Sequence, residues 1–233
     1  MVLGGLQKNS LIDYPGKVSC VLFLSGCNFS CPYCHNPDLV NGDEFCASSL
    51  DIQKVYEFLE IRKGFLDGVV ISGGEPTIHK KLAHLCKKIK QIGYSLKLDT
   101  NGSRPKIIKE LINEGLVDYI AMDIKTDPFH YSPLITTDHN PDNILSSIQI
   151  IMESTITYEF RTTCVQPFVD AQIIGKIANI IEGAVLYALQ RFHNIGVLQP
   201  EFFSKINPGY DDAELVRLQS IAEPWVKKCI IRS

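Results

Sequence analysis

The sequence alternates six times between a short apolar run and a longer stretch with helical periodicity, and this alternation constrains the fold more than any other feature. Each apolar run is long enough for one strand, and the stretches between them are long enough for helices. Strands that alternate with helices in this way usually pair in parallel, with the helices as crossovers. We therefore predict a parallel α/β sheet, either open or curled into a barrel. The predicted strands cover residues 18–24, 68–72, 94–99, 118–124, 158–164 and 185–191.

The predicted helices lie between these strands, and one more follows the last strand. This C-terminal helix runs from Asp211 to Trp225, with Asp211 or Asp212 as its cap, because an aspartate side chain can accept hydrogen bonds from the first helical turn. The other helices cover about 49–62, 79–92, 105–114, 141–154 and 170–182.

Composition and charge narrow the class of protein. An apolar content of 45% is ordinary for a globular protein, and 233 residues can enclose a full hydrophobic core. The net charge of −3 gives no general attraction to nucleic acid. No apolar stretch approaches the roughly 20 residues that span a bilayer, and the N-terminus lacks the pattern of a secretory signal. We predict a cytoplasmic protein that uses neither nucleic acid nor a membrane as a partner.

The chain carries no repeat, low-complexity tract or interdomain linker. Residues 1–233 are therefore predicted to form one domain. Its core barrel would cover about 18–193, followed by a C-terminal extension over about 194–233.

Polar motifs follow the predicted strands at their carboxyl ends. In parallel α/β folds this edge of the sheet carries the active site, so the motifs predict a single site there. In strand order the motifs are Cys27–Cys34, GGEP at Gly73–Pro76, DTNG at Asp99–Gly102, Asp123 with Lys125, Arg161–Cys164 and His193.

Cys27, Cys31 and Cys34 stand in the run CNFSCPYC, and no fourth cysteine follows at ligand spacing. A [4Fe–4S] cluster takes one thiolate per iron, so three thiolates leave one iron open to another ligand. Structural zinc needs four ligands, and His35, the only nearby candidate, is adjacent to Cys34 and so poorly placed to reach the same metal. The triad predicts a cluster in a reducing compartment, with chemistry at the open iron.

The GGEP motif has two interpretations. Gly73 and Gly74 could form only a tight turn, since glycine tolerates positive φ. Followed by Glu75 and Pro76, and next to an under-ligated cluster, they instead predict a backbone edge that approaches a small ligand and accepts hydrogen bonds from its ammonium group.

These motifs, in this order and spacing, resemble the radical S-adenosylmethionine (SAM) superfamily. DTNG and DIK, with His193 in LQRFHN, narrow the resemblance to activating enzymes of glycyl radical enzymes. The run GLQKNSLIDYPGKVSCVLFLSGCNFSCPYCHNPDLV is especially similar to activating proteins of anaerobic ribonucleoside-triphosphate reductase. The resemblance covers most of the chain, strongly to about residue 125, and implies a partial (β/α)6 TIM-like barrel of the radical SAM type.

The resemblance also implies a role for each motif residue. Cys27, Cys31 and Cys34 would ligate one [4Fe–4S] cluster, and the amino and carboxylate groups of SAM would bind its fourth iron. Only Cys46 lies between the triad and GGEP, so a single cluster is expected. The implied SAM contacts are Tyr33 at the adenine, Gly73, Gly74 and Glu75 at the methionine ammonium, Asp99 and Asn101 near the ribose and carboxylate, and Asp123, Lys125 and His193. Asp99 and Asp123 could also hold a monovalent cation.

The implied activity is the generation of a glycyl radical in a partner enzyme. An electron from a flavodoxin or ferredoxin would cleave SAM to a 5′-deoxyadenosyl radical, which would abstract a hydrogen atom from a glycine. The expected partner is anaerobic ribonucleoside-triphosphate reductase, although other glycyl radical enzymes fit. Two alternatives stay open: a radical SAM enzyme acting on a small molecule, similar to carboxy-deazaguanine synthases, and a non-enzymatic iron–sulfur or zinc protein.

Several residues have a plain structural interpretation. Lys125 could pair with Asp123 or Asp127 at the surface, and His193 and Arg161 could serve only the fold. The lysines at 80–90 are expected on a solvated helix face. Cys20, Cys86 and Cys229 lie in apolar patterns and are expected to pack in the hydrophobic core as small side chains. Cys164 ends the predicted strand 158–164 and could line the cavity. The loop 126–140 and the run Asn194–Tyr210 are candidates for the rim that receives the partner's glycine.

Overall fold

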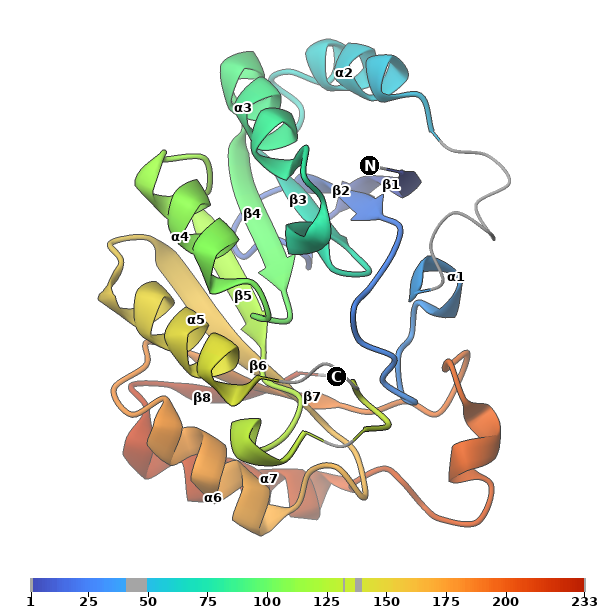
Figure 1. Cartoon of the computed structure of the whole chain (residues 1–233), viewed down its shortest axis with the longest axis vertical. Helices are drawn as coiled ribbons and strands as arrows, with labels where there is room; N and C mark the ends of the chain where they lie inside the picture. Colours follow the sequence, from blue (N-terminus) through green and yellow to red (C-terminus); the bar gives the residue numbers. More distant parts are fainter. Residues whose placement is uncertain (1, 41–49, 132, 137–139, 233) are drawn as a thin grey trace.

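The computed structural model describes residues 2–40, 50–131, 133–136 and 140–232, and an eight-stranded sheet organises them (Figure 1). The strands pair in sequence order, and the six predicted ones form its parallel centre, as expected. These strands are β2 (Ser19–Leu24), β3 (Gly68–Gly73), β4 (Ser95–Thr100), β5 (Tyr119–Asp123), β6 (Thr157–Cys164) and β7 (Tyr187–Arg191).

Two edge strands extend this parallel centre beyond the prediction. β1 (Leu3–Ser10) pairs antiparallel with β2, and β8 (Cys229–Arg232) pairs parallel with β7. The order of the described strands starts at β1 and ends at β8 without a pairing between the two, so the sheet stays open. The predicted partial barrel is confirmed, and the C-terminal extension contributes its last strand.

Apart from the short helix Pro37–Val40, which was not predicted, the helices cover the outside of the curved sheet, and their positions agree with the predicted ones (Figure 1). Asp211 caps the last helix: its side chain accepts a hydrogen bond from the Glu214 N–H, and the Glu214 side chain accepts one from the Asp211 N–H. None of the helices in the described residues is long and apolar enough to cross a membrane. The helices are α1 (Pro37–Val40), α2 (Ile52–Ile61), α3 (Leu82–Ile92), α4 (Pro105–Asn113), α5 (Pro141–Glu153), α6 (Ala171–Ile180) and α7 (Asp212–Ala222).

Side chains alternate along each strand between the helix layer and the barrel interior. Those that face the helices form the main core, which includes Cys20, Cys86 and Cys229, as predicted. A smaller apolar cluster fills part of the interior, with Tyr14 from the β1–β2 loop packed against Tyr119 of β5. The rest of the interior is polar, and this polar part opens at the carboxyl ends of the strands.

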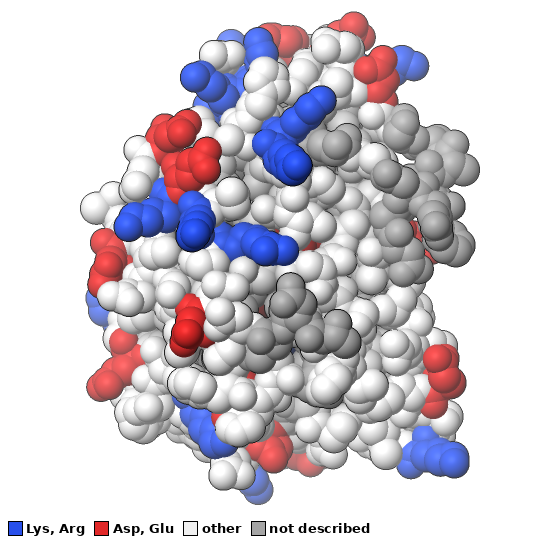
Figure 2. All heavy atoms as spheres, viewed as in Figure 1, with Lys and Arg blue, Asp and Glu red and all other residues white. Residues whose placement is uncertain are grey.

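The predicted lysine run lies on the solvent side of α3. Lys80, Lys81, Lys87 and Lys88 are exposed, and Figure 2 shows basic side chains gathered over α3 and α4. Lys90 is only half-exposed, because its ammonium binds both carboxylate oxygens of Asp118 at 2.7 Å. The expectation of a mainly solvated helix face is therefore confirmed.

Candidate active site

A cavity of about 280 Å³ lies at the carboxyl ends of strands β2 to β7. Its wall contains every predicted site residue except His193, so residues that lie far apart in the sequence meet at one place. These residues are Cys27, Cys31, Tyr33, Cys34, Gly73, Gly74, Glu75, Asp99, Asn101, Asp123 and Lys125. Arg161, Thr163, Gln190 and Arg191 add polar groups from β6 and β7.

The three cysteines lie in the loop that leaves β2, residues 25–36, which we name the cysteine loop. Backbone hydrogen bonds shape it: the Cys34 N–H donates to the Cys31 carbonyl at 2.9 Å, and the Phe29 N–H donates to Cys27 Sγ at 3.3 Å. Burial, with a contribution from Glu75, raises the pKa of the Cys27 thiol to about 12. Burial likewise raises the pKa of Cys31 to about 11. A thiolate at either position therefore needs a cationic partner, such as iron.

The three thiols suit a cluster better than a single metal ion. Within the ranges that the structure describes, no three side chains of His, Cys, Asp or Glu converge as ligands of one ion. In a [4Fe–4S] cluster, by contrast, each cysteine binds a different iron, so thiols distributed along one cavity wall can all be ligands. The donor set and its placement therefore fit the predicted cluster.

The segment after β5 holds one side of the cysteine loop. The Ser30 N–H donates to the Ile135 carbonyl at 2.7 Å, and the Phe29 ring packs against the Tyr131 ring with centroids 5.8 Å apart. The predicted rim loop 126–140 is thus, at these positions, a support of the cysteine loop. Its residues 132 and 137–139 lie outside the described residues, as does Cys46.

The segment after β7 holds the other side. The N–H groups of Leu198 and Gln199 donate to the carbonyls of Cys34 and Pro32, each at 3.0 Å. A group of packed aromatic rings fills the space between this segment and the cysteine loop; it consists of Tyr33, Phe168, Phe192, Phe202 and Phe203. Tyr33 therefore has a packed ring that also forms part of the cavity wall.

The glycines of GGEP lie directly against the start of the cysteine loop. A Cβ on Gly73 would lie 2.2 Å from the Leu24 carbonyl oxygen, and a Cβ on Gly74 would lie 2.0 Å from that of Gly26. The Gly74 N–H donates to the Leu24 carbonyl, and the Glu75 N–H donates to that of Gly26, both at 2.8 Å. Because both residues lack a side chain, the two backbone segments can approach closely. Gly73 and Gly74 also line the cavity.

Glu75 is 1% exposed, and its carboxylate is already bound within the protein. It accepts hydrogen bonds from the N–H and hydroxyl of Thr77, at 3.0 and 2.5 Å, and from the Thr100 hydroxyl at 2.8 Å. The Asn101 N–H donates to its other oxygen at 2.6 Å. Burial raises the pKa of Glu75 even so. The geometry gives Glu75 a structural function: it joins the loops that follow β3 and β4.

Asn101 connects the loop after β4 to the cysteine loop. Its Nδ2 donates to Asn28 Oδ1 at 3.0 Å, and Asn28 in turn donates to the Ser103 hydroxyl at 2.9 Å. Asn28 was not predicted as a site residue, although its position inside CNFSC offered a signal. Asn101 and Asn28 therefore fix the cysteine loop relative to β4.

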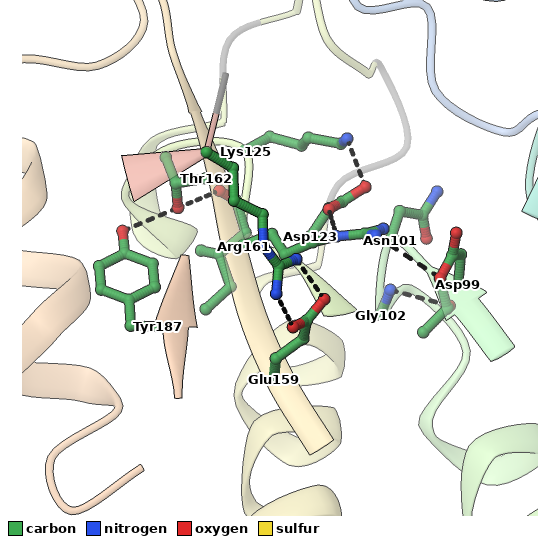
Figure 3. A network of polar contacts seen from close by, with 12 residues as sticks. Asp99, Asn101, Gly102, Asp123, Lys125, Glu159, Arg161, Thr162 and Tyr187 are labelled. Atoms are coloured by element: carbon green, nitrogen blue, oxygen red, sulfur yellow. Dashed lines mark hydrogen bonds and ion pairs between the residues drawn. The ribbon is translucent and has the colours of Figure 1, made fainter. Parts of the chain in front are cut away.

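A charged wall faces the cavity from β4, β5 and β6 (Figure 3). Arg161 Nε donates to Asp123 at 2.7 Å, and its terminal nitrogen lies 3.6 Å from Asp99. The Lys125 ammonium binds Asp123 at 3.1 Å. Although burial favours the neutral acid, Arg161 and Lys125 hold the pKa of Asp123 below its ordinary value. Burial also disfavours the charged form of Lys125, but the neighbouring carboxylate of Asp123 holds the pKa of Lys125 above its ordinary value.

The Lys125–Asp123 pair that the structural interpretation predicted does form, but in the cavity wall and not at an exposed surface. Asp127 has other partners: Lys176 and His130 both contact its carboxylate at 2.9 Å.

Further charges lie deeper in the barrel and were not predicted. The Lys97 ammonium contacts the Asp99 carboxylate and does not itself line the cavity. Glu159, which is 1% exposed, binds the Arg232 guanidinium with both oxygens, at 2.8 and 2.6 Å, and accepts a hydrogen bond from the Tyr119 hydroxyl. The sequence did contain a signal for these charges. Alternate residues of a strand point to the same face, so residues 97 and 99, like 159 and 161, share the inward face of their strands.

Two predicted positions lie away from the cavity. His193, which follows the end of β7 at Arg191, lines a separate hollow with Ile195 and Ile206. Cys164 is fully buried on the helix side of β6 and is absent from the cavity wall, so the idea that it lines the cavity is wrong. Gln190 and Arg191 occupy the end of β7 that faces the cavity.

Comparison with known proteins agrees with this site. The model of the "Radical SAM superfamily" matches residues 21–174, which include the cysteine loop and the charged wall. A protein of Methanocaldococcus jannaschii named "Putative glycyl-radical enzyme activating enzyme" is 33% identical over 237 residues, covering 100% of this chain and 96% of the relative. The pyruvate formate-lyase-activating enzyme of Clostridium pasteurianum is 28% identical, covering 90% of each chain.

A solved structure supports the fold independently of close sequence similarity. The crystal structure of Streptococcus suis SuiB superposes with a TM-score of 0.69 at 15% identity and covers 91% of this chain. The chain spans about half of SuiB (48%), so the likeness concerns the shared fold alone. From its cysteines, its sheet and the match over residues 21–174, the chain belongs to the radical SAM superfamily, a family of enzymes that implies a [4Fe–4S] cluster and SAM as cofactors.

Proposed function

We propose that this protein is an activating enzyme that generates a glycyl radical on a partner enzyme. The observation that carries the proposal is the single cavity in which three cysteine thiols share a wall with a cluster of buried charges. The similarity to activating enzymes over nearly the full length of the chain gives the reaction class. Cys27, Cys31 and Cys34 are the proposed ligands of the cluster.

The charged wall suits the amino-acid part of SAM. Asp99 and Asp123 lie among the cations of Lys97, Lys125 and Arg161, so this group carries one positive charge in excess. A ligand carboxylate would neutralise that excess, and a buried charge is stable only when it is paired. The ligand's ammonium would be bound near Gly73 and Gly74, while Tyr33 and Asn101 complete the wall around the nucleoside. Contacts by Glu75 and His193 stay predictions.

The chain itself orients the reactants and limits the access of water. When bound, the cluster and SAM would supply the radical chemistry: with one electron from a flavodoxin or ferredoxin, SAM would yield methionine and 5′-deoxyadenosine, and the hydrogen atom taken up by 5′-deoxyadenosine would come from the partner's glycine, which would be left as a glycyl radical. The two segments that hold the cysteine loop keep its thiols fixed relative to the charged wall. Such fixed positions lower a barrier by orientation.

The proposed partner is anaerobic ribonucleoside-triphosphate reductase, supported by the similarity of the first 40 residues to its activating proteins. The test mixes the reconstituted protein, SAM and a reductant with this reductase, or with a pyruvate formate-lyase, under anaerobic conditions. We expect the EPR doublet of a glycyl radical on the reductase, and none with Cys31→Ala. A doublet only on the lyase would contradict the choice of partner but not the reaction class.

A radical SAM enzyme acting on a small molecule, similar to carboxy-deazaguanine synthases, is the alternative. It predicts rapid formation of a modified small molecule with no protein partner and no glycyl radical on either enzyme. That pair of results would overturn the activating function while leaving the cluster and SAM in place.

A further inference from the structure

Lys97 is an unusual residue in the centre of the barrel. It is 1% exposed, and of the lysines and arginines that the structure describes, it alone is fully buried. Its ammonium contacts the carboxylate of Asp99 and lies 5.8 Å from the centroid of the Tyr119 ring. Lys97 is not part of the cavity wall, whereas Asp99 is. Lys97 therefore makes no direct contact with a ligand in the cavity and can act on it through its charge and through Asp99.

The neighbouring acid does not explain the position of Lys97. Glu159 lies in the same interior, but Arg232 already binds both of its oxygens and Tyr119 donates a further hydrogen bond. Burying an ammonium is costly unless a counter-charge accompanies it. Among the contacts that the structure gives Lys97, Asp99 is the anion, so the two charges form one functional unit.

The balance of charge shows what this unit does to the cavity. Asp99 and Asp123 lie close enough that Arg161 reaches both, at 3.6 and 2.7 Å. With Lys125 and Arg161 alone, the two carboxylates would be neutralised and nothing would balance a third one. Lys97 adds the missing positive charge from the inside of the barrel, where a screening solvent does not reach.

We propose that Lys97 is a positioning residue that supplies the charge for which a monovalent cation would otherwise be needed beside Asp99 and Asp123. This inference rests on the proposed function, since the third carboxylate is that of SAM. It replaces the monovalent cation that the family resemblance suggested at Asp99 and Asp123 by a cation that belongs to the chain. Binding of SAM by this protein should consequently be independent of potassium and sodium.

The test is calorimetric titration of SAM into the anaerobic, reconstituted protein in potassium chloride and in choline chloride of equal ionic strength. The choline ion is too large to replace a buried ammonium, so only potassium can occupy the space that Lys97→Met vacates. Wild type should bind equally, within about twofold, in both salts. Lys97→Met should bind about tenfold or more weakly in choline and recover most of this loss in potassium, in line with ordinary coupling between two sites.

A second readout does not depend on SAM. Potassium should raise the melting temperature of unliganded Lys97→Met relative to choline, and should leave that of wild type unchanged. Lys90→Met is the matched control, because it removes a lysine that also binds an aspartate, but on the outside of the barrel. It should show no difference between the salts in either measurement.

The possible outcomes separate the two proposals. Wild type that binds SAM only in potassium contradicts the role of Lys97 and leaves the proposed function intact. Lys97→Met that binds weakly and equally in both salts shows a merely structural residue and also contradicts it. Wild type that binds SAM in neither salt contradicts the proposed function. If Lys97→Met fails to fold, the wild-type comparison still tests the proposal, because binding of SAM that requires potassium contradicts it.

Discussion

Gly74 shows how one missing side chain decides where the cysteine loop can lie. The cysteine loop leaves β2 next to the end of β3, and the backbone of Gly74 touches that of Gly26. Glu75 then fixes the same contact by accepting hydrogen bonds from the loop after β4. The motif GGEP thus fixes the position of the cysteine loop through backbone contacts, in addition to any contact with SAM.

Gly74→Ala should therefore damage the cluster site. Its new Cβ would lie 2.0 Å from the Gly26 carbonyl oxygen, so the cysteine loop must move. We expect a loss of about 1–3 kcal/mol in the free energy of unfolding, as for other overpacked sites, and less bound iron and sulfide after reconstitution. Gly175→Ala is the control, since its Cβ would have an ordinary contact at 3.7 Å. Full iron content in Gly74→Ala would show that the contact is unimportant.

At the same scale, the sequence predicted residues whose chemistry is local and missed those whose role depends on burial. The spacing of Cys27, Cys31 and Cys34 is sufficient to identify them, because few structures other than a metal or cluster site need three close cysteines. Lys97 and Glu159 carry no motif. Their roles depend on facing the interior of a curved, open sheet, and the alternation that reveals this is short in each strand.

The cysteine loop is an element without regular structure of its own, and neighbouring segments hold it in place. The segment after β5 binds it through Ile135, and the segment after β7 binds it through Leu198 and Gln199. Side chains complete both contacts, with Phe203 fully buried among the aromatic rings. The site therefore depends on stretches of these segments, around Ile135 and Leu198, that contain none of the proposed cluster ligands.

Phe203→Ala should loosen the cysteine loop from one side. The ring is 2% exposed and packs against Phe192 and Phe202, so its removal should cost about 3–5 kcal/mol of stability, as for other buried aromatic residues. Chemical denaturation measures this loss, and absorbance on exposure to air follows the faster decay of the cluster. Phe65→Ala, at a ring that is 72% exposed, should change neither quantity appreciably.

Asp127 holds the other segment and gives it a dependence on pH. Burial favours the neutral acid, but Lys176, the Phe129 N–H and His130 keep the pKa of Asp127 below its ordinary value of 3.8. A lowered pKa stabilises the fold above the pKa of the unfolded chain, and this stabilisation is lost as the pH falls through the folded pKa. The stability that Asp127 contributes should thus be complete at neutral pH, start to fall below about pH 4, and be lost once the pH is below the pKa of the folded state.

Asp127→Asn tests that dependence by chemical denaturation between pH 3 and 7. The variant should be about 1 kcal/mol less stable than wild type at pH 7, and the difference should shrink as the acid is protonated. Asp142→Asn, at an exposed position in the first turn of α5, should follow the wild-type profile closely. A difference that grows toward low pH would contradict the assigned direction of the pKa shift.

Among the elements, the six central strands and the helices were predictable because their apolar runs are long and bounded by polar or glycine residues. β1 escaped prediction, since LGGLQKNS combines two glycines with a polar end and pairs on one edge only. β8 has four residues, too few for a pattern. Edge strands owe their structure to a neighbour that is already in place, and local sequence does not contain that information.

Over the whole molecule, the last strand, β8, contributes an ion pair to the barrel interior as well as backbone pairing with β7. Arg232 of β8 reaches Glu159 of β6, with β7 lying between them in the sheet. The residues proposed to bind the cofactors all precede β8, yet the interior that supports them is complete only when the C-terminal strand has been added.

Arg232→Met should consequently destabilise the whole fold. It leaves the Glu159 carboxylate buried without a cation, which typically costs about 3–5 kcal/mol. The double variant Glu159→Gln/Arg232→Met should recover part of that loss, because no buried charge remains. Arg217→Met, at an exposed site of α7, serves as the control in thermal unfolding. Equal stability of the single and double variants would argue against the proposed pairing.

The most direct test of a single cluster-and-SAM site is the anaerobic cleavage of SAM. The protein is reconstituted with iron and sulfide and reduced with dithionite, and 5′-deoxyadenosine is quantified by mass spectrometry after SAM is added. Wild type and Cys229→Ala should form it, whereas Cys27→Ala, Cys31→Ala and Cys34→Ala should not, since these are the three cysteines in the described part of the chain that line the cavity. Formation by any of the three variants would contradict the account. So would a four-iron wild-type protein that forms none and whose EPR spectrum does not change with SAM.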